Sequence, residues 1–205
     1  MPPDIIQSVW DSLPTNQKMK FEAYAATLTK WQKSINLVSP NTLPHIKERH
    51  ILDSYQLIQH IPSSTKTIYD LGSGAGFPAL VIAIACPDLD IHCIESDQRK
   101  CEFIKTISRE NDIPVTVHMG RIESFQALAA PDLITARALS SLKNLLDWTE
   151  FWRNGVKQPS YLLPKGETWQ QEIKEAEMDY SFDYKDYPSM TDPAARLLLV
   201  DNILK

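Results

Sequence analysis

The spacing of apolar residues changes near residue 65, and this change divides the chain into two parts. Before it, apolar residues recur every three or four positions in the runs 5–13, 21–31 and 43–61, as they do on one face of a helix. The segment IPSST (61–65) ends the third run, which we expect to be a helix from about residue 41 to residue 60. The pattern predicts an N-terminal helical cap over residues 1–64.

After residue 65, short β-rich runs alternate with longer helical runs. The five strand-like runs are TIYDL (67–71), DIHCIE (90–95), PVTVHM (114–119), DLITA (132–136) and SYLLP (160–164). Such alternation is typical of βαβ units, in which helices cover both faces of a parallel sheet. The chain ends in two further strand-like runs, 180–188 and 195–205, with no helix between them, so we expect a closing antiparallel strand. Residues 65–205 are therefore predicted to form one α/β domain with a mostly parallel seven-stranded sheet.

A glycine-rich segment, DLGSGAGF (70–77), stands where the first predicted strand should turn into the first helix. Open α/β sheets present backbone N–H groups to ligands at this edge, so we expect those of this segment to face a ligand, and three missing Cβ atoms would let a bulky ligand press on the backbone. The third glycine comes one residue too early for the GxGxxG fingerprint of dinucleotide-binding folds. With an acid before it and another acid at the end of the second strand, the arrangement resembles that of class I S-adenosyl-L-methionine (SAM) methyltransferases.

Glu95, at the tip of the second predicted strand, could accept hydrogen bonds from both ribose hydroxyls of an adenosine, or it could be a solvated strand-end acid. Asp70 could cap the glycine turn or meet an amino group of the ligand. Residues 121–123 follow the third strand, where this fold meets the adenine, although a surface turn could look the same. The predicted cofactor-binding residues are Asp70, Gly72, Gly74, Gly76, Phe77, Glu95, Arg121, Ile122, Glu123 and Arg137.

Composition and charge narrow the possible functions. The chain has 205 residues, of which 43% are hydrophobic, and a net charge of −5, as expected for one main globular domain. Its longest apolar stretch, residues 79–86, is too short to cross a bilayer, and an acid near the N-terminus is atypical of a signal peptide. Three cysteines at gaps of seven and eight residues fit neither a zinc knuckle nor a redox pair. We therefore expect a cytoplasmic protein without a membrane contact or a metal site.

Basic residues are predicted at the rim where the glycine turn lies. Arg121, Arg137 and Lys165 follow the third, fourth and fifth strands, so they should gather at the carboxyl ends, either as a site for a polyanion or as solvated charges. Arg49 and His50 would extend this patch if the cap leans over the rim, although His50 could equally be a core histidine. Residues 167–192 hold eight acids against two lysines, so we expect a polyanion to bind away from them.

Seven segments, in this order, resemble the RsmG (GidB) family of bacterial methyltransferases, which modify N7 of one guanine in 16S ribosomal RNA close to the decoding site. They are WQKSINLVS (31–39), ERHILDSY (48–55), DLGSGAGFPA (70–79), ESDQRKCEFI (95–104), GRIESF (120–125), TARALSSL (135–142) and LLPKG (162–166). The chain departs from the family at Thr135, where a Ser is frequent, and in its closing strand, where Asp201 and Asn202 replace apolar residues. The second departure leaves the pairing of the last strand open.

The resemblance implies a Rossmann-like class I fold, SAM as cofactor, and 16S rRNA or the small ribosomal subunit as partner, with no obligatory protein partner evident. It implies catalytic roles for Arg137 and Lys165, and RNA-binding roles for Asn36, Arg49, His50, Asp53 and Lys165. Asn36 and Asp53 would be the acceptors for the Watson–Crick edge of the guanine. Because guanine N7 carries a free lone pair, the reaction needs no general base, and in-line displacement would rely on alignment and electrostatics.

Two other functions fit parts of the sequence. An NAD(P)-dependent oxidoreductase could use a similar sheet, but the early third glycine and the lack of an obvious hydride-transfer pair count against it. A non-catalytic, nucleotide-responsive RNA-binding assembly protein could keep the fold without turnover. Damage to the glycine turn or loss of Lys165 would favour that interpretation, and neither is present.

Overall fold

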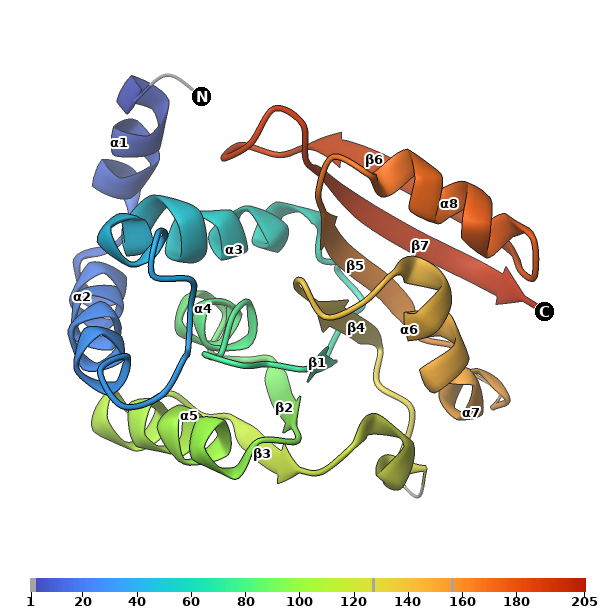
Figure 1. Cartoon of the computed structure of the whole chain (residues 1–205), viewed down its shortest axis with the longest axis horizontal. Helices are drawn as coiled ribbons and strands as arrows, with labels where there is room; N and C mark the ends of the chain where they lie inside the picture. Colours follow the sequence, from blue (N-terminus) through green and yellow to red (C-terminus); the bar gives the residue numbers. More distant parts are fainter. Residues whose placement is uncertain (1–2, 127, 156) are drawn as a thin grey trace.

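The computed structural model describes residues 3–126, 128–155 and 157–205, and over them the chain forms one seven-stranded sheet with helices on both faces (Figure 1). The strand order is β3-β2-β1-β4-β5-β7-β6, and β7 runs antiparallel to both of its neighbours. The predicted fold, a mostly parallel sheet with a closing antiparallel strand, is confirmed. The strands are Thr67–Leu71 (β1), Asp90–Glu95 (β2), Thr116–Met119 (β3), Leu133–Ala136 (β4), Ser160–Lys165 (β5), Ser181–Pro188 (β6) and Arg196–Leu204 (β7).

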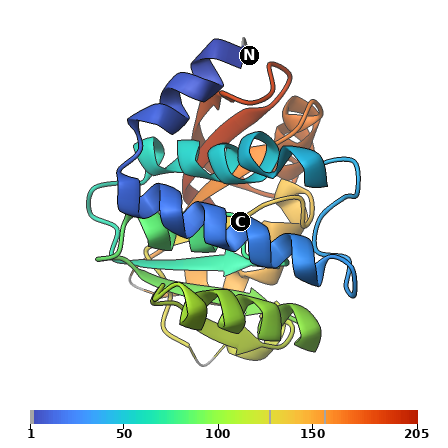
Figure 2. The same ribbon diagram turned by 90° about the vertical axis from the view of Figure 1, so that its left-hand side faces the viewer.

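The helices cover the two faces of the sheet unequally. One face carries α6 (Leu142–Trp148), α7 (Glu150–Arg153) and α8 (Trp169–Glu177). The other carries α4 (Ala79–Ala85) and α5 (Gln98–Glu110), with the predicted cap packed over them (Figure 2). Residues 79–84 of α4 are all buried, because the helix lies between the sheet and the cap. Among the described helices, none has the length and apolar character needed to cross a membrane.

The cap consists of α1 (Pro3–Ser12), α2 (Thr15–Trp31) and a winding helical segment over residues 43–60, and residues 1 and 2 lie outside the described part. This segment is not the single regular helix that the sequence predicts. It passes from a 3₁₀ turn (Leu43–His45) through a π-helical turn (Lys47–Leu52) and α3 (Asp53–Tyr55) to a second 3₁₀ turn (Gln56–His60). Apolar side chains of α2 share one hydrophobic cluster with α4 and α5, so the core continues across residue 64.

The pairing of the last strand, left open by the sequence, is resolved by a bulge. β6 and β7 pair along their length, with a register shift between Ser181 and Asp183. Asn202 takes a positive φ of 53° at this place, and its amide nitrogen donates to Asp183 at 2.7 Å. The two polar residues of the closing strand therefore accommodate the bulge, while the flanking Val200 and Ile203 stay buried.

Candidate functional site

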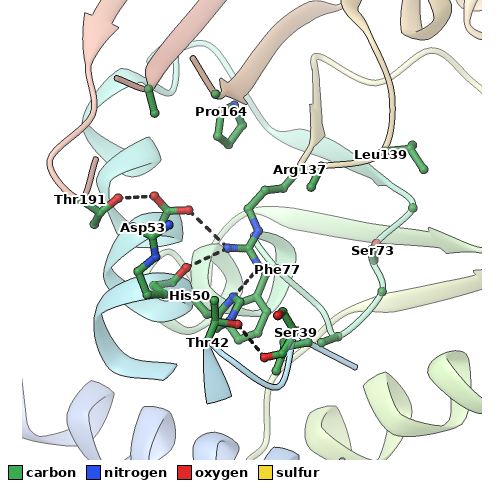
Figure 3. Close-up of a pocket in the computed structure, with 18 of the residues that line it drawn as sticks. Ser39, Thr42, His50, Asp53, Ser73, Phe77, Arg137, Leu139, Pro164 and Thr191 are labelled. Atoms are coloured by element: carbon green, nitrogen blue, oxygen red, sulfur yellow. Dashed lines mark hydrogen bonds and ion pairs between the residues drawn. The ribbon is translucent and has the colours of Figure 1, made fainter. Parts of the chain in front are cut away.

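A cavity of about 750 Å³ opens at the carboxyl ends of β1, β2, β4 and β5, between the sheet and the cap (Figure 3). The predicted site residues that line it come from both parts of the chain: Arg49, His50, Asp53, Gly72, Gly74, Phe77, Glu95, Arg137 and Lys165. The cap therefore leans over the rim of the sheet. This is the condition under which Arg49 and His50 were expected to extend the basic patch. The sheet and the cap together build one site.

Six predicted residues lie outside the lining of this cavity. Asn36 is exposed and contacts Gln32, while Asp70 and Gly76 lie beneath the glycine turn. The remaining three follow β3; Ile122 is buried in the core, and Arg121 and Glu123 are exposed. Roles for these six in ligand binding remain predictions.

The glycine turn offers a flat backbone surface, and four of its N–H groups already have partners within the chain. Gly72 and Ser73 donate to the carbonyl of Ile94, and Gly76 donates to the carbonyl of Ser73. The fourth, that of Gly74, donates to Glu95 Oε2 at 2.8 Å. We expected these N–H groups to face a ligand, but they fix the shape of the turn. A ligand can press on the turn at Gly74, where an added Cβ would find open space apart from the carbonyl oxygen of Gly72 at 3.7 Å.

At the other two glycines of the turn, a positive φ of 62° at Gly72 and 87° at Gly76 disfavours any side chain, and close neighbours add to this. A Cβ on Gly72 would lie 2.5 Å from Leu139, which belongs to the loop after β4 and lines the cavity. A Cβ on Gly76 would lie 2.4 Å from Leu80 of α4 and 3.1 Å from the hydroxyl of Tyr24 in the cap. Alternate glycines therefore let the turn fit between the cap and the loop after β4.

Glu95 holds the turn and lines the cavity at the same time. Its Oε2 accepts from Gly74, its Oε1 accepts from the backbone N–H of Asp97 at 2.8 Å, and the residue is 7% exposed. Each carboxylate oxygen can accept a second hydrogen bond. The side chain is thus oriented in advance, with free lone pairs, at the tip of β2.

Asp70 lies in the core below the turn. Thr135 of β4 donates to its Oδ1 at 2.8 Å, while its Oδ2 is buried without a partner in the described structure. Burial raises the pKa of this carboxyl to about 7, and the hydrogen bonds from neighbouring side chains and the charge of Arg137 lower it only in part. The structure favours the role of a capping residue beneath the turn, although the unpartnered oxygen leaves an amino group of a ligand open as a partner.

Replacing Asp70 with asparagine should stabilise the free chain increasingly as the pH rises. The folded chain binds a proton more tightly than the unfolded one, because its Asp70 pKa is about 7 rather than 3.8. The stability contributed by Asp70 is therefore complete below about pH 4 and is lost as the pH rises to about 7. We expect an advantage of about 2 to 4 kcal/mol for Asp70→Asn at pH 8 and little at pH 4. Thermal unfolding across this range, with the surface variant Asp88→Asn as control, would contradict this if both variants behaved alike.

Arg137 joins the loop after β4 to the cap (Figure 3). Its guanidinium donates to the carbonyl of Arg49 at 3.2 Å, to Asp53 Oδ2 at 3.3 Å and to His50 Nδ1 at 2.8 Å. The π-helical turn and the first residue of α3 bring these three acceptors around one side chain. The exposed fractions of the Arg137 and Asp53 side chains are only 17% and 21%. Asp53 also accepts from Thr191 and Gln56, so it is not a free acceptor for a base.

His50 is a neutral member of this network. It is 7% exposed, and burial and the charges of Arg137 and Arg49 lower its pKa to about 4. Because Nδ1 accepts from Arg137, Nε2 carries the proton and donates to Thr42 Oγ1 at 2.8 Å. The ring stacks on Phe77, whose other neighbour is Tyr24 of α2. Tyr24 in turn donates to the carbonyl of Ala75, so the stack links the cap to the glycine turn.

Lys165 is not the solvated rim charge that the sequence allows as one of two interpretations. It is 6% exposed, and its ammonium donates to Glu172 at 2.7 Å and to the carbonyl of Ser140 at 2.8 Å. Burial lowers its pKa, and Glu172 acts in the opposite direction. The side chain lines the cavity, but it also fixes α8 to the loop after β4. A contact between Lys165 and RNA phosphate remains a prediction.

Sequence reasoning missed one wall of the cavity, the turn between β6 and β7. Ser189, Thr191, Asp192, Ala195 and Arg196 line the site from this turn, which lies at the end of the acidic segment 167–192. Its sequence carries only a turn signal, because Pro188 and Pro193 flank it. One end of the acidic segment therefore borders the cavity, and the expectation that a polyanion binds away from this segment stays a prediction.

Comparison with known sequences finds related proteins over most of the chain. The model of one protein family, described as GidB, rRNA small subunit methyltransferase G, matches residues 17–197. Proteins of Parvibaculum lavamentivorans and Paramagnetospirillum magneticum, both named Ribosomal RNA small subunit methyltransferase G, are 44% and 41% identical over 184 and 180 residues. The alignments cover 87% of this chain in both cases, and 80% and 85% of the relatives.

Solved structures share the fold at low sequence identity. The cofactor-bound Rv0187 from MTB aligns with a TM-score of 0.64 at 13% identity, over 98% of this chain and 97% of its own. The O-methyltransferase TomG from Streptomyces achromogenes, in complex with SAM, aligns with a TM-score of 0.57 at 11% identity, over 89% of both chains. These likenesses establish the class I methyltransferase fold of the chain.

Proposed function

We propose, on the premise that this chain belongs to the GidB family, rRNA small subunit methyltransferase G, that it methylates N7 of one guanine in 16S ribosomal RNA. The family establishes that the chain is an enzyme, a SAM-dependent rRNA methyltransferase. An NAD(P)-dependent oxidoreductase and a non-catalytic assembly protein are thereby disfavoured. Because ribosomal RNA is its substrate, we place the enzyme in the cytoplasm.

The observation that carries the proposal is the shared cavity. On the side of the sheet, the cavity is lined by the glycine turn and Glu95. On the side of the cap, it is lined by a network of neutral and paired side chains around Arg137. Its volume of about 750 Å³ is within the range of ligand pockets, and it is ample for a nucleoside cofactor. The remaining space, between Arg137 and the turn after β6, is where an acceptor base would enter.

The residues of the sheet side fit SAM. Its positively charged sulfonium supplies an activated methyl group when the cofactor is bound. Glu95 would accept from the ribose hydroxyls with lone pairs that the chain leaves free, and the open face at Gly74 would receive the flat adenosine. Phe77 and Leu139 add apolar walls that exclude water from the reacting groups.

The residues on the cap side of the cavity fit a methyl acceptor that does not have to lose a proton in the reaction. A general base near neutral pH would be a histidine or carboxylate with a raised or unperturbed pKa, within reach of the acceptor. His50 is held as a hydrogen-bond acceptor for Arg137, and Asp53 is paired with the same guanidinium. With both groups occupied, the chain contributes alignment and electrostatic complementarity, which suits guanine N7.

The position of the methyl group tests the proposal directly. Small subunits lacking the modification would be incubated with enzyme and labelled SAM, and the nucleosides of the isolated 16S rRNA would be separated by chromatography and mass. We expect 7-methylguanosine at one site, mapped by borohydride and aniline cleavage of the RNA. Label in 1-methylguanosine, N2-methylguanosine or a ribose would overturn the N7 assignment. Parallel reactions with naked 16S rRNA would define which form of the RNA is the substrate.

The chemical rate should be nearly independent of pH between about 6 and 9, since no base takes part. His50, with a pKa of about 4, does not titrate in this range. Single-turnover methyl transfer with saturating RNA and SAM measures the step without the binding equilibria. If the rate instead rose or fell with pH near neutrality, and this dependence disappeared in His50→Ala, the base-free mechanism would be contradicted. A pH dependence of the rate that disappears in Asp70→Asn would instead reflect ionisation of the buried carboxyl beneath the glycine turn.

A further inference from the structure

The turn between β6 and β7 is fixed to the cap at the mouth of the cavity. Thr191 Oγ1 donates to Asp53 Oδ1, and Gln56, which is 2% exposed, donates to Ser189 Oγ at 3.2 Å. Gln56 also accepts from the backbone N–H of Met190 at 2.6 Å. These contacts hold the turn in a defined position against residues 53–56. The turn therefore keeps a fixed position beside the cavity that it lines.

Asp192 places a negative charge in the lining of the cavity, where RNA would bind. Its side chain is 40% exposed, against 21% for Asp53, and Glu95 as a whole residue is 7% exposed. Among the described carboxylates that line the cavity, Asp192 thus faces solvent most openly. Its Oδ1 accepts from the backbone N–H of Ala194 at 3.0 Å, which fixes the direction of the carboxylate. A negative charge at this position repels RNA phosphate.

The Asp192 carboxylate faces Arg49, the most exposed arginine of the network around the site. The distance from Arg49 NH1 to Asp192 Oδ2 is 3.9 Å, and the arginine side chain is 47% exposed. Exposed ion pairs of this kind contribute only about 0.2 to 1 kcal/mol, so a phosphate can displace the carboxylate. Arg137 differs, because its three acceptors hold it in the interior.

We propose that Asp192 acts as an internal competitor of RNA phosphate for Arg49. The inference rests on the proposed function, because it assumes an RNA substrate at this cavity. A phosphate that reaches Arg49 must displace the Asp192 carboxylate, and the cost of this displacement is the same for every RNA that uses the contact. Asp192 therefore weakens the binding of any RNA that contacts Arg49.

Neutralising the carboxylate tests the proposal in the full chain. Affinities of the wild type and Asp192→Asn would be measured for unmodified small subunits and for a non-target RNA duplex, at about 50 to 200 mM salt. For Asp192→Asn we expect the affinities for both RNAs to rise about two- to fivefold, and the salt dependence of log K to steepen by about one.

Matched variants separate this effect from net charge. Asp88→Asn removes the same charge at an exposed position before β2, at the opposite edge of the sheet from the cavity, and should leave the salt slope unchanged. In the Arg49→Ala background, the Asp192→Asn change should lose most of its effect, as a double-mutant cycle requires of interacting residues. Equal effects of Asp192→Asn and Asp88→Asn would overturn the proposal. Weaker target binding by Asp192→Asn would also overturn it, and would assign Asp192 a direct contact with RNA.

The result is distinguishable from failure of the proposed function. Methyl transfer by the wild type is measured separately on the same small subunits. Absence of 7-methylguanosine would contradict the N7 assignment, while the RNA affinities would still report on Asp192. Equal RNA affinities of the wild type and Asp192→Asn would contradict the competition, whatever base is methylated.

Discussion

Replacing Arg137 with alanine should lower the single-turnover rate of methyl transfer by at least about 100-fold, the loss that small misplacements of reacting groups produce. The change leaves the carbonyl of Arg49, the carboxylate of Asp53 and the ring of His50 without their shared donor. A largely buried carboxylate without its partner should also cost about 2 to 4 kcal/mol of stability. Thermal unfolding and rate measurements at a temperature well below the transition separate the two effects.

The lysine variant decides how Arg137 acts. A single ammonium cannot hold three separate acceptors in the geometry of the guanidinium fork, although it keeps the charge. If Arg137 positions the cap over the cavity, Arg137→Lys should be nearly as slow as Arg137→Ala. If it only supplies positive charge to phosphate or to the cofactor, lysine should restore most of the rate. Arg109→Ala, at the exposed end of α5, controls for the loss of one positive charge.

The sheet could be predicted because each of its signals is local. Alternating strand-like and helical runs, the glycine turn after β1 and the acid at the end of β2 fix the strands and place the cofactor side of the site. The same logic placed Arg137 and Lys165 at the rim, since Arg137 follows β4 and Lys165 is the last residue of β5. Local sequence patterns do not show which side chains a residue will contact. The burial of Lys165 against Glu172, seven residues further on, was therefore not predicted.

The acceptor side could not be predicted because it depends on contacts between distant segments. Asp53 meets Thr191 across 138 positions, and Gln56 meets Met190 across 134. The π-helical turn has no periodic signal of its own, because its side chains resemble those of an ordinary helix. Asn36 and Asp53 were reasonable acceptors for a base by chemistry alone, but one lies outside the cavity and the other is already paired.

Replacing Glu95 with alanine should weaken SAM binding by about 10- to 100-fold, which corresponds to the loss of hydrogen bonds to a charged acceptor. The carboxylate has two tasks, since it shapes the glycine turn through Gly74 and has lone pairs left for the ribose. Calorimetric titration with S-adenosylhomocysteine measures the affinity without turnover. Glu110→Ala, an exposed acid at the end of α5, provides the matched control and should bind like the wild type.

A cofactor analogue separates the two tasks of Glu95. The wild type should lose affinity for 2′-deoxy-S-adenosylhomocysteine, because one ribose hydroxyl no longer donates to the carboxylate. If Glu95 binds the ribose, Glu95→Ala should bind the deoxy and the parent compound equally, since the acceptor is already gone. If Glu95 only shapes the turn, the variant should lose affinity for both compounds and still prefer the parent compound as strongly as the wild type does. An unchanged affinity of Glu95→Ala for the parent compound would remove Glu95 from the cofactor site altogether, and the flat surface at Gly74 would then have to bind the adenosine without it.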